Sequence, residues 1–273
     1  MFIALQVKVE FHWGYWIRRP GTSKYQGVVP IPPPTTLIGA LTSSLAKTSK
    51  IPVSGEVLRL HGKGIVSPAY LLEGSILASS CYLEGIAYPW DDLNRYITLH
   101  FQAKTRDSEE EKEAGGRRYL AKYRFGAIPC GKVYYPSGMM TISYIFSEEK
   151  LRNLMNNPEV ELEEAAWEIQ RIGSKESITT VKEVKILTEL DEIQKGEEIK
   201  TKYYFPRRLG NPKSGEYYLE RFWRLGWGRN LEAEFEEYLV PGTRIPVKSS
   251  EVTVEVNEKA LVLEKGECIL VGA

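Results

Sequence analysis

The sequence predicts an α+β fold in which β-strands outnumber helices. It opens on a strand, a long loop and a helix between residues 2 and 46, and a pair of alternating segments follows around residues 96–125. The second half turns to short apolar strands after two helical stretches. Strands mixed with few helices are typical of α+β proteins rather than of doubly wound parallel sheets. The 273 residues suffice for one large domain or two small ones.

The opening strand spans residues 2–10, and a loop rich in aromatic residues, arginine, glycine and proline follows over residues 11–34. Three consecutive prolines end this loop and force an extended approach to a helix. We expect Thr35 or Thr36 to cap that helix, because a threonine side chain accepts hydrogen bonds from the first helical N–H groups. Apolar residues then recur at helical spacing, at Leu37, Ile38, Leu41 and Leu45.

The middle of the chain predicts a long β-hairpin. Strands are expected at residues 56–60 and 75–83. Residues 96–104 alternate between polar and apolar side chains, and residues 117–125 mirror them across a polar tract that contains two glycines. We interpret residues 96–125 as a hairpin that protrudes from the body and has a flexible tip.

The second half predicts a helix pair and a β-rich region. A strand at residues 138–146 comes first, and helices are expected at residues 147–156 and 160–171, on either side of a proline. Further strands are expected at residues 177–187, 199–205, 251–256, 260–264 and 267–271. We therefore divide the chain into residues 1–146 and residues 147–273.

Residues that carry metal or nucleophile chemistry are sparse. The sequence has no paired cysteines, no HxxxH and no GxSxG motif, so no metal and no cofactor are expected. Asp91 and Asp92 fit a turn or a helix cap. Residues 126–133 have the spacing of a phosphate loop, but Val133 replaces the magnesium-binding Ser or Thr and no helix can follow. Among the histidines, His12 in the aromatic loop is the best candidate for a general acid or base.

Composition argues against a duplex binder with an overall basic excess. The chain has 36 basic and 36 acidic residues, a formal net charge of zero. RNA binding would therefore rely on local basic patches. The three cysteines lie far apart, no apolar run reaches the roughly 20 residues of a membrane span, and the opening residues lack the pattern of a signal peptide. We expect a cytoplasmic location.

Four stretches combine positive charge with aromatic residues or glycine, and the densest lies between residues 200 and 229. Arginine and lysine contact phosphates, while aromatic rings stack on unpaired bases. The structural alternatives are a loop folded over the core, a solvated hairpin arm, an ordinary helix terminus and a set of core aromatics. The candidate RNA-binding residues are Trp16, Arg18, Arg19, Lys24, Lys104, Arg106, Arg117, Arg118, Lys122, Arg124, Arg171, Ser174, Lys175, Arg207 and Arg208.

Three segments together resemble CRISPR-associated protein family five of the RAMP superfamily, and most closely its archaeal type I-A branch. They are the opening strand, the Pro-Pro-Pro-Thr-Thr-Leu-Ile-Gly-Ala-Leu helix start at residues 32–41, and Arg-Ile-Gly-Ser-Lys-Glu-Ser at residues 171–177. The resemblance implies an N-terminal ferredoxin-like (RRM-like) domain with a long β-hairpin thumb, plus a smaller β-rich C-terminal part.

The same resemblance implies a role in antiviral defence. The protein would bind the 5′ handle of the guide RNA (crRNA), with Thr35 and Thr36 near the handle and the thumb pressing on the RNA beside it. The implied partners are the backbone family-seven subunit and the large subunit of a type I Cascade complex.

Alternatives stay open at this point. One branch of the family, in type I-C systems, cleaves the guide precursor with a Tyr, a Lys and a His, and here His12, Lys24 and either Tyr15 or Tyr25 are the only nearby set. The equivalent RAMP subunit of a type III complex has a similar opening. A protein scaffold that binds no RNA would also fit the zero net charge. Because a separate family-six nuclease is expected in type I-A systems, we favour a non-catalytic RNA-binding subunit.

Overall fold

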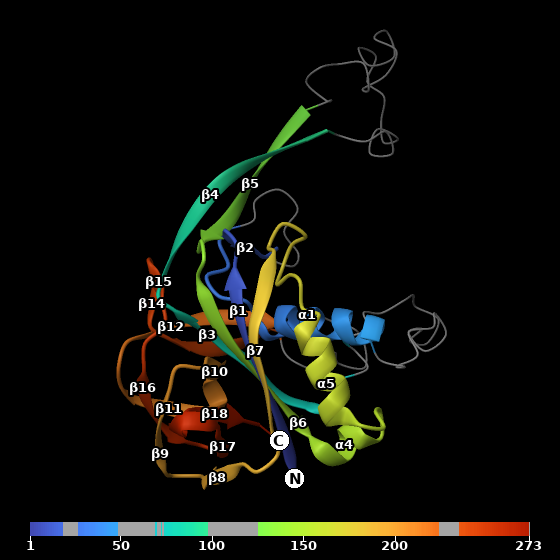
Figure 1. Cartoon of the computed structure of the whole chain (residues 1–273). Coiled ribbons are helices and arrows are strands. Elements are labelled where there is room, and N and C mark those ends of the chain that lie inside the picture. Colours follow the sequence, from blue (N-terminus) through green and yellow to red (C-terminus); the bar gives the residue numbers. More distant parts are fainter. Residues whose placement is uncertain are drawn as a thin grey trace, which may run out of the picture.

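A four-stranded antiparallel sheet forms the centre of the molecule (Figure 1). The computed structural model describes residues 1–18, 27–48, 69, 72, 74–97, 125–223 and 235–272. The sheet has the order β3-β6-β1-β7, with the strands β1 (Phe2–Phe11), β3 (Ile76–Glu84), β6 (Met139–Ser147) and β7 (Thr179–Leu187). Since β1 pairs with both β6 and β7, the strand that opens the chain lies in the interior of the sheet.

Two helices, α1 (Pro34–Thr48) and α5 (Pro158–Trp167), pack against each other on one face of this sheet (Figure 1). A short helix, α4 (Glu148–Arg152), follows β6. One core cluster joins the helices to the sheet and includes Ile3, Leu5, Val7, Leu37, Leu41, Leu45, Leu162, Ala165 and Ala166. The helical spacing of the α1 leucines and the alternation along β1 therefore meet in a single core.

The start of α1 differs from the expectation. Pro34 occupies the first helical position, where a missing N–H costs no intrahelical hydrogen bond. The N–H groups of Thr36 and Leu37 donate to the carbonyl oxygen of Pro33 at 2.9 and 3.2 Å. The prediction that Thr35 or Thr36 caps the helix was therefore wrong, because both threonines lie inside its first turn.

A β-hairpin rises from the body (Figure 1). Its sheet has the order β14-β15-β4-β5-β2, with the strands β2 (Gly14–Trp16), β4 (Ile86–Ile97), β5 (Phe125–Tyr134), β14 (Thr243–Arg244) and β15 (Val247–Lys248). β4 and β5 pair from Tyr88 opposite Tyr134 to Ile97 opposite Phe125. The predicted hairpin at residues 96–125 lies mostly outside the described residues, and the paired arms begin closer to the body than expected.

Two local expectations are settled within this hairpin. Asp91 and Asp92 lie in β4, so the predicted turn or helix cap was wrong. The physical reason is a cross-strand ion pair, in which Lys132 Nζ lies 2.7 Å from Asp92 Oδ2. Residues 126–133 belong to the continuous strand β5, which agrees with the rejection of a phosphate loop.

Three small antiparallel sheets make up most of the C-terminal part, in the orders β10-β13-β12, β11-β16-β9 and β18-β17-β8. Their strands are β8 (Asp191–Gln194), β9 (Glu198–Thr201), β10 (Phe205–Pro206), β11 (Gly210–Ser214), β12 (Tyr217–Trp223), β13 (Phe235–Pro241), β16 (Val252–Val256), β17 (Lys259–Val262) and β18 (Cys268–Val271). Two 3-10 turns, η4 (Arg207–Leu209) and η5 (Glu264–Gly266), interrupt them. The predicted β-rich α+β class is confirmed.

Several boundaries moved. The first predicted helix ends at Arg152, and the predicted strand at 199–205 splits into β9 and β10. The short strands β2, β8 and β11 to β13 were not predicted. The division after residue 146 stays a prediction. Strand β7 comes after this division in the sequence, but it pairs with β1, which comes before it. In the part of the chain that the structure describes, no helix is long and apolar enough to cross a membrane.

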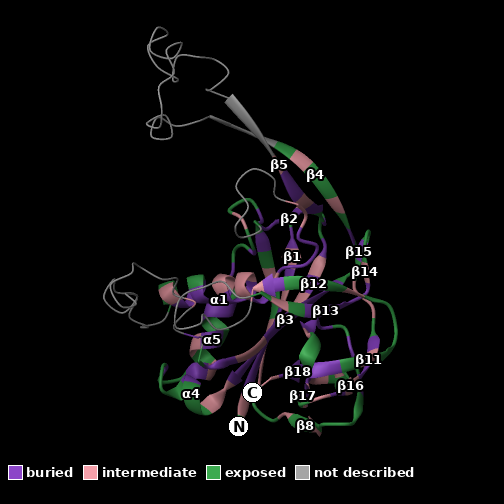
Figure 2. Ribbon diagram, turned by 180° about the vertical axis from the view of Figure 1, so that it is seen from behind, coloured by how far each residue is buried: buried purple, intermediate pink, exposed green. Residues whose placement is uncertain are grey.

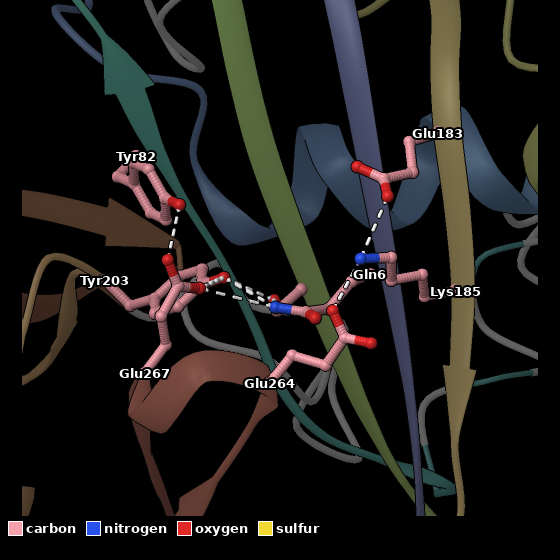
Figure 3. A network of polar contacts seen from close by, with 8 residues as sticks. Gln6, Tyr82, Glu183, Lys185, Tyr203, Glu264 and Glu267 are labelled. Atoms are coloured by element: carbon pink, nitrogen blue, oxygen red, sulfur yellow. Dashed lines mark hydrogen bonds and ion pairs between the residues drawn. The ribbon is translucent and has the colours of Figure 1, made fainter.

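A polar network joins the other face of the central sheet to the C-terminal strands (Figure 3). The Glu267 carboxylate accepts hydrogen bonds from the hydroxyls of Tyr82 at 2.6 Å and Tyr203 at 3.0 Å, and from Gln6 Nε2 at 3.5 Å. Burial, together with the hydrogen bond to Glu267, raises the pKa of Tyr82 above its ordinary value, so its hydroxyl stays a donor. The network fixes the segment before β18 against β1 and β3.

Candidate nucleic-acid interface

A groove lies beside β2, α1 and the segment that links α5 to β7. It encloses about 990 Å³, near the upper end of the roughly 300–1,000 Å³ that is usual for ligand sites. Its walls come from residues 16–18, 36–47 and 168–179. The fold therefore brings together three segments that are far apart in the sequence.

The α1 wall consists of small side chains and one lysine. Thr36, Gly39, Ala40, Ser43 and Lys47 recur three or four residues apart and share one face of the helix. A Cβ atom added to Gly39 would meet no atom within 4 Å. Because no bulky side chain of the described residues covers this face, it leaves room for a ligand along the helix.

The linking segment is joined to the end of β2 by two hydrogen bonds. The Ser174 N–H donates to the Trp16 carbonyl, and the Trp16 N–H donates to Ser177 Oγ, both at 2.9 Å. Gly173 has a φ of +103°, and a Cβ there would lie 2.8 Å from the Trp16 carbonyl oxygen. Only glycine allows this close approach without strain, so the Gly-Ser-Lys-Glu-Ser motif shapes this wall.

Four exposed cations line the groove: Arg18, Lys47, Arg171 and Lys175. None of them forms an ion pair with a residue that the structure describes, whereas Lys8, Lys185 and Arg208 each lie within 2.9 Å of a carboxylate oxygen. Two carboxylates, Glu168 and Glu176, share the lining. The cations of the groove thus differ from these three, which are paired with carboxylates. Positive charge of this kind suits phosphate groups.

Two buried polar atoms in the groove lining have no hydrogen-bond partner in the part of the chain that the structure describes. Trp16 Nε1 and Thr179 Oγ1 have no hydrogen-bond partner among the described residues, although both residues are more than nine-tenths buried. Buried polar groups in native proteins are nearly always satisfied. A ligand that reached these atoms would therefore gain hydrogen bonds at little further desolvation cost.

A smaller hollow of about 220 Å³ continues the groove past the first turn of α1. The two share Ile17, Arg18 and Thr36. Thr35, Arg221, Phe222, Trp223 and Phe235 also line the hollow. The positive end of the α1 dipole lies here, which favours an anion near Thr35 and Thr36.

The structure brings part of the predicted set together. Trp16, Arg18, Thr36, Arg171, Ser174 and Lys175 line the groove, and Thr35 lines the adjoining hollow. Arg207 and Arg208 lie in η4 and line neither, and Arg208 binds Glu236 at 2.9 Å and Glu258 at 2.7 Å. The candidates Arg19, Lys24, Lys104, Arg106, Arg117, Arg118, Lys122 and Arg124 lie outside the described residues.

The sequence analysis missed the α1 wall of the groove. Gly39, Ser43 and Lys47 were not candidates, although their helical spacing on the face opposite the leucines was a usable signal. Among the aromatics of residues 200–229, Tyr203, Tyr204 and Phe222 belong to the core, as expected for part of that set.

The His12 constellation is only partly present. His12 is exposed, and its Nε2 lies 2.8 Å from Thr180 Oγ1. Tyr15 is fully buried, its hydroxyl donates to the Pro30 carbonyl, and burial raises its pKa well above the ordinary value. Tyr15 is therefore not an accessible partner for His12, while Lys24 and Tyr25 fall outside the described residues. Within the described ranges, no group of acidic, His or Cys side chains is arranged to hold a metal.

Two comparisons with known proteins found CRISPR-associated proteins. No protein-family model matches the chain. A Saccharolobus solfataricus protein, CRISPR-associated protein Cas5 3, is 32% identical over 263 residues, covering 94% of this chain and 95% of the relative. The CRISPR system aCascade subunit Cas5 1 of the same organism is 31% identical over 263 residues, with the same coverage.

A solved structure supports the fold. The crystal structure of a CRISPR protein from Archaeoglobus fulgidus matches with a TM-score of 0.57 and 23% identity, and the match covers 99% of both chains. With curated relatives above 30% identity over nearly the full length, this chain belongs to the CRISPR-associated Cas5 family.

Proposed function

We propose that this Cas5 protein binds the 5′ handle of the guide RNA within a type I-A Cascade complex, and that the groove holds the handle. One observation carries the proposal. Six residues predicted from three distant segments line one groove, and four cations there have no ion pair with a described residue. The name of one relative, an aCascade subunit, supports the complex.

The charge pattern of the groove suits single-stranded RNA. Arg18, Lys47, Arg171 and Lys175 would contact phosphates, and the small side chains of α1 leave room for the strand. If all four cations engage phosphates, the RNA affinity falls by about 50-fold between roughly 50 and 200 mM salt. The reason is that binding releases counterions from the RNA, and this release is less favourable at higher salt. A protein scaffold without RNA would show no such dependence.

We further propose that β1, α1, β3, β6, α5 and β7 form the ferredoxin-like domain expected for the family. The strand order β3-β6-β1-β7, with both helices on one face, supports this proposal. Such a domain would end at Leu187, because β7 pairs with β1, and this proposal replaces the boundary expected after residue 146. The C-terminal sheets would follow it. The β4–β5 hairpin would be the root of the thumb. The proposed neighbours are the family-seven backbone subunit and the large subunit, in the cytoplasm.

Charge reversal tests the groove. The variant Arg171→Glu/Lys175→Glu should bind labelled repeat RNA about 10- to 100-fold more weakly by fluorescence anisotropy, since charged phosphate contacts are lost and repulsion is added. The control Lys150→Glu/Lys195→Glu changes two exposed lysines that lie outside both hollows. Equal affinities for the two double variants, with both folded by circular dichroism, would refute the proposal.

A denaturing gel of the same incubation, in EDTA, separates binding from cleavage. We expect the RNA to stay uncut. One of the two candidate tyrosines, Tyr15, is buried and its hydroxyl donates to the Pro30 carbonyl. A cut at one discrete position that disappears in His12→Ala would replace the binding subunit with a processing nuclease.

A further inference from the structure

Three exposed aromatic side chains lie together on the β4–β5 hairpin. Tyr88 is 60% exposed, Trp90 61% and Tyr134 51%. Tyr88 is directly opposite Tyr134, and Trp90 is two residues along the same strand. Residues opposite each other or two apart share a face of a sheet. The three rings, which we call the aromatic strip, therefore form one surface of the hairpin. Most of strand β4 on this hairpin is exposed over residues 86–93 (Figure 2).

The aromatic strip is continuous with the groove. Lys132 on β5 is opposite Trp90 on one side and opposite Trp16 on the other, so these three residues form a row across β4, β5 and β2. Trp16 lines the groove. Trp13 makes a second link, because its ring centroid lies 5.9 Å from that of Tyr134 and its Nε1 donates to the carbonyl of Glu176, another groove residue.

The strip offers ring faces and little net charge. Lys132 is neutralised by Asp92 at 2.7 Å, and its ammonium group lies about 6 Å from the rings of Trp13 and Trp16. This contrasts with the groove, whose four cations form no ion pair with any described residue. Of the exposed apolar side chains described on this face, three are aromatic and one, Ile86, is aliphatic. The pattern is that of surfaces on which unpaired bases stack next to a site that holds phosphates.

We propose that the aromatic strip is a stacking platform for unpaired bases of an RNA strand that leaves the groove. The inference rests on the proposed function, since the strand is held by the groove. Every base has a ring face, so the platform accepts any sequence. The phosphate contacts of the groove fix the position of the strand, and the strip adds affinity that depends on bases rather than on charge.

The test compares three RNAs by anisotropy: a short handle RNA, the same RNA extended by uridines at either end, and the same extensions built from abasic residues. The wild-type protein should gain about fivefold or more from a uridine extension at one end, and nothing from the abasic one. The variant Tyr88→Leu/Trp90→Leu/Tyr134→Leu should lose this gain and bind the short RNA as before. Leucine keeps the apolar surface and removes the rings.

Trp167→Ala is the matched control, because Trp167 is 50% exposed on α5 and lines neither hollow. It should keep the full gain. Failure of the wild type to bind the short RNA would overturn the proposed function and this inference with it. Binding of the short RNA without a base-dependent gain overturns the inference alone. An unchanged gain in the leucine variant, together with lost assembly with partner subunits, would make the strip a protein-docking surface instead.

Discussion

Replacing Gly173 by alanine should destabilise the protein and deform the groove. At a φ of +103°, a residue with a Cβ is strained, which costs about 1–3 kcal/mol. The new Cβ would lie 2.8 Å from the Trp16 carbonyl oxygen and 3.0 Å from Ile17 Cγ1. Relieving that contact weakens the hydrogen bond from Ser174 to Trp16, worth about 1 kcal/mol. The expected loss is about 2–4 kcal/mol.

Thermal denaturation measures this loss. We expect the melting temperature of Gly173→Ala to fall by about 5–15 °C, and its RNA affinity to fall at temperatures where it is still folded. Gly39→Ala is the matched control, because a Cβ there meets nothing within 4 Å and alanine stabilises a helix by up to about 1 kcal/mol over glycine. If Gly173→Ala melts at the wild-type temperature, the close approach that shapes this wall is not needed.

Three further predictions follow from the same contacts. Gly39→Leu should leave the melting temperature unchanged or higher while abolishing RNA binding, since the leucine side chain fills the groove. Intact RNA binding in this variant would show that the RNA does not bind in the groove. Glu267→Ala should lower the free energy of unfolding by about 2–4 kcal/mol in urea, because Tyr82 and its neighbours lose their acceptor, whereas Glu267→Gln should lose less; equal losses would contradict this. Lys132 lowers the pKa of Asp92, so the pair stabilises the fold at pH values above the unfolded-state pKa of Asp, about 4. This contribution disappears as pH falls through the lower folded pKa. NMR titration should show that pKa return toward its ordinary range in Lys132→Met, and an unchanged pKa would rule the pair out as its cause.

Local patterns along the sequence determined much of the architecture. The alternation of β1 and the leucine spacing of α1 follow from what each element buries on one face, and both patterns appear as core contacts. The motif at residues 171–177 was recognised by its resemblance to the family, and the structure adds that Gly173 has a φ of +103°, which favours glycine. The same patterns led to the Cas5 family.

Short strands with no apolar period were beyond such patterns. β2 spans three residues in an aromatic loop, and it is defined by its pairing with β5 rather than by its own residues. The first turn of α1 also depended on context, because Pro33 supplies the acceptor that a threonine side chain was expected to provide.

The pairing of charged side chains depended most on the tertiary structure. The sequence has equal numbers of acidic and basic residues, and no local pattern shows which of the candidates Arg171 and Arg208 forms ion pairs in the fold. The fold places Arg208 between Glu236 and Glu258, and it places Arg171 in the groove, without an ion pair to any described residue. The sequence by itself determined the family, the fold class and the motifs. Which cations are available to RNA depended on residues distant along the chain, because an ion pair forms only where the folded path brings opposite charges together.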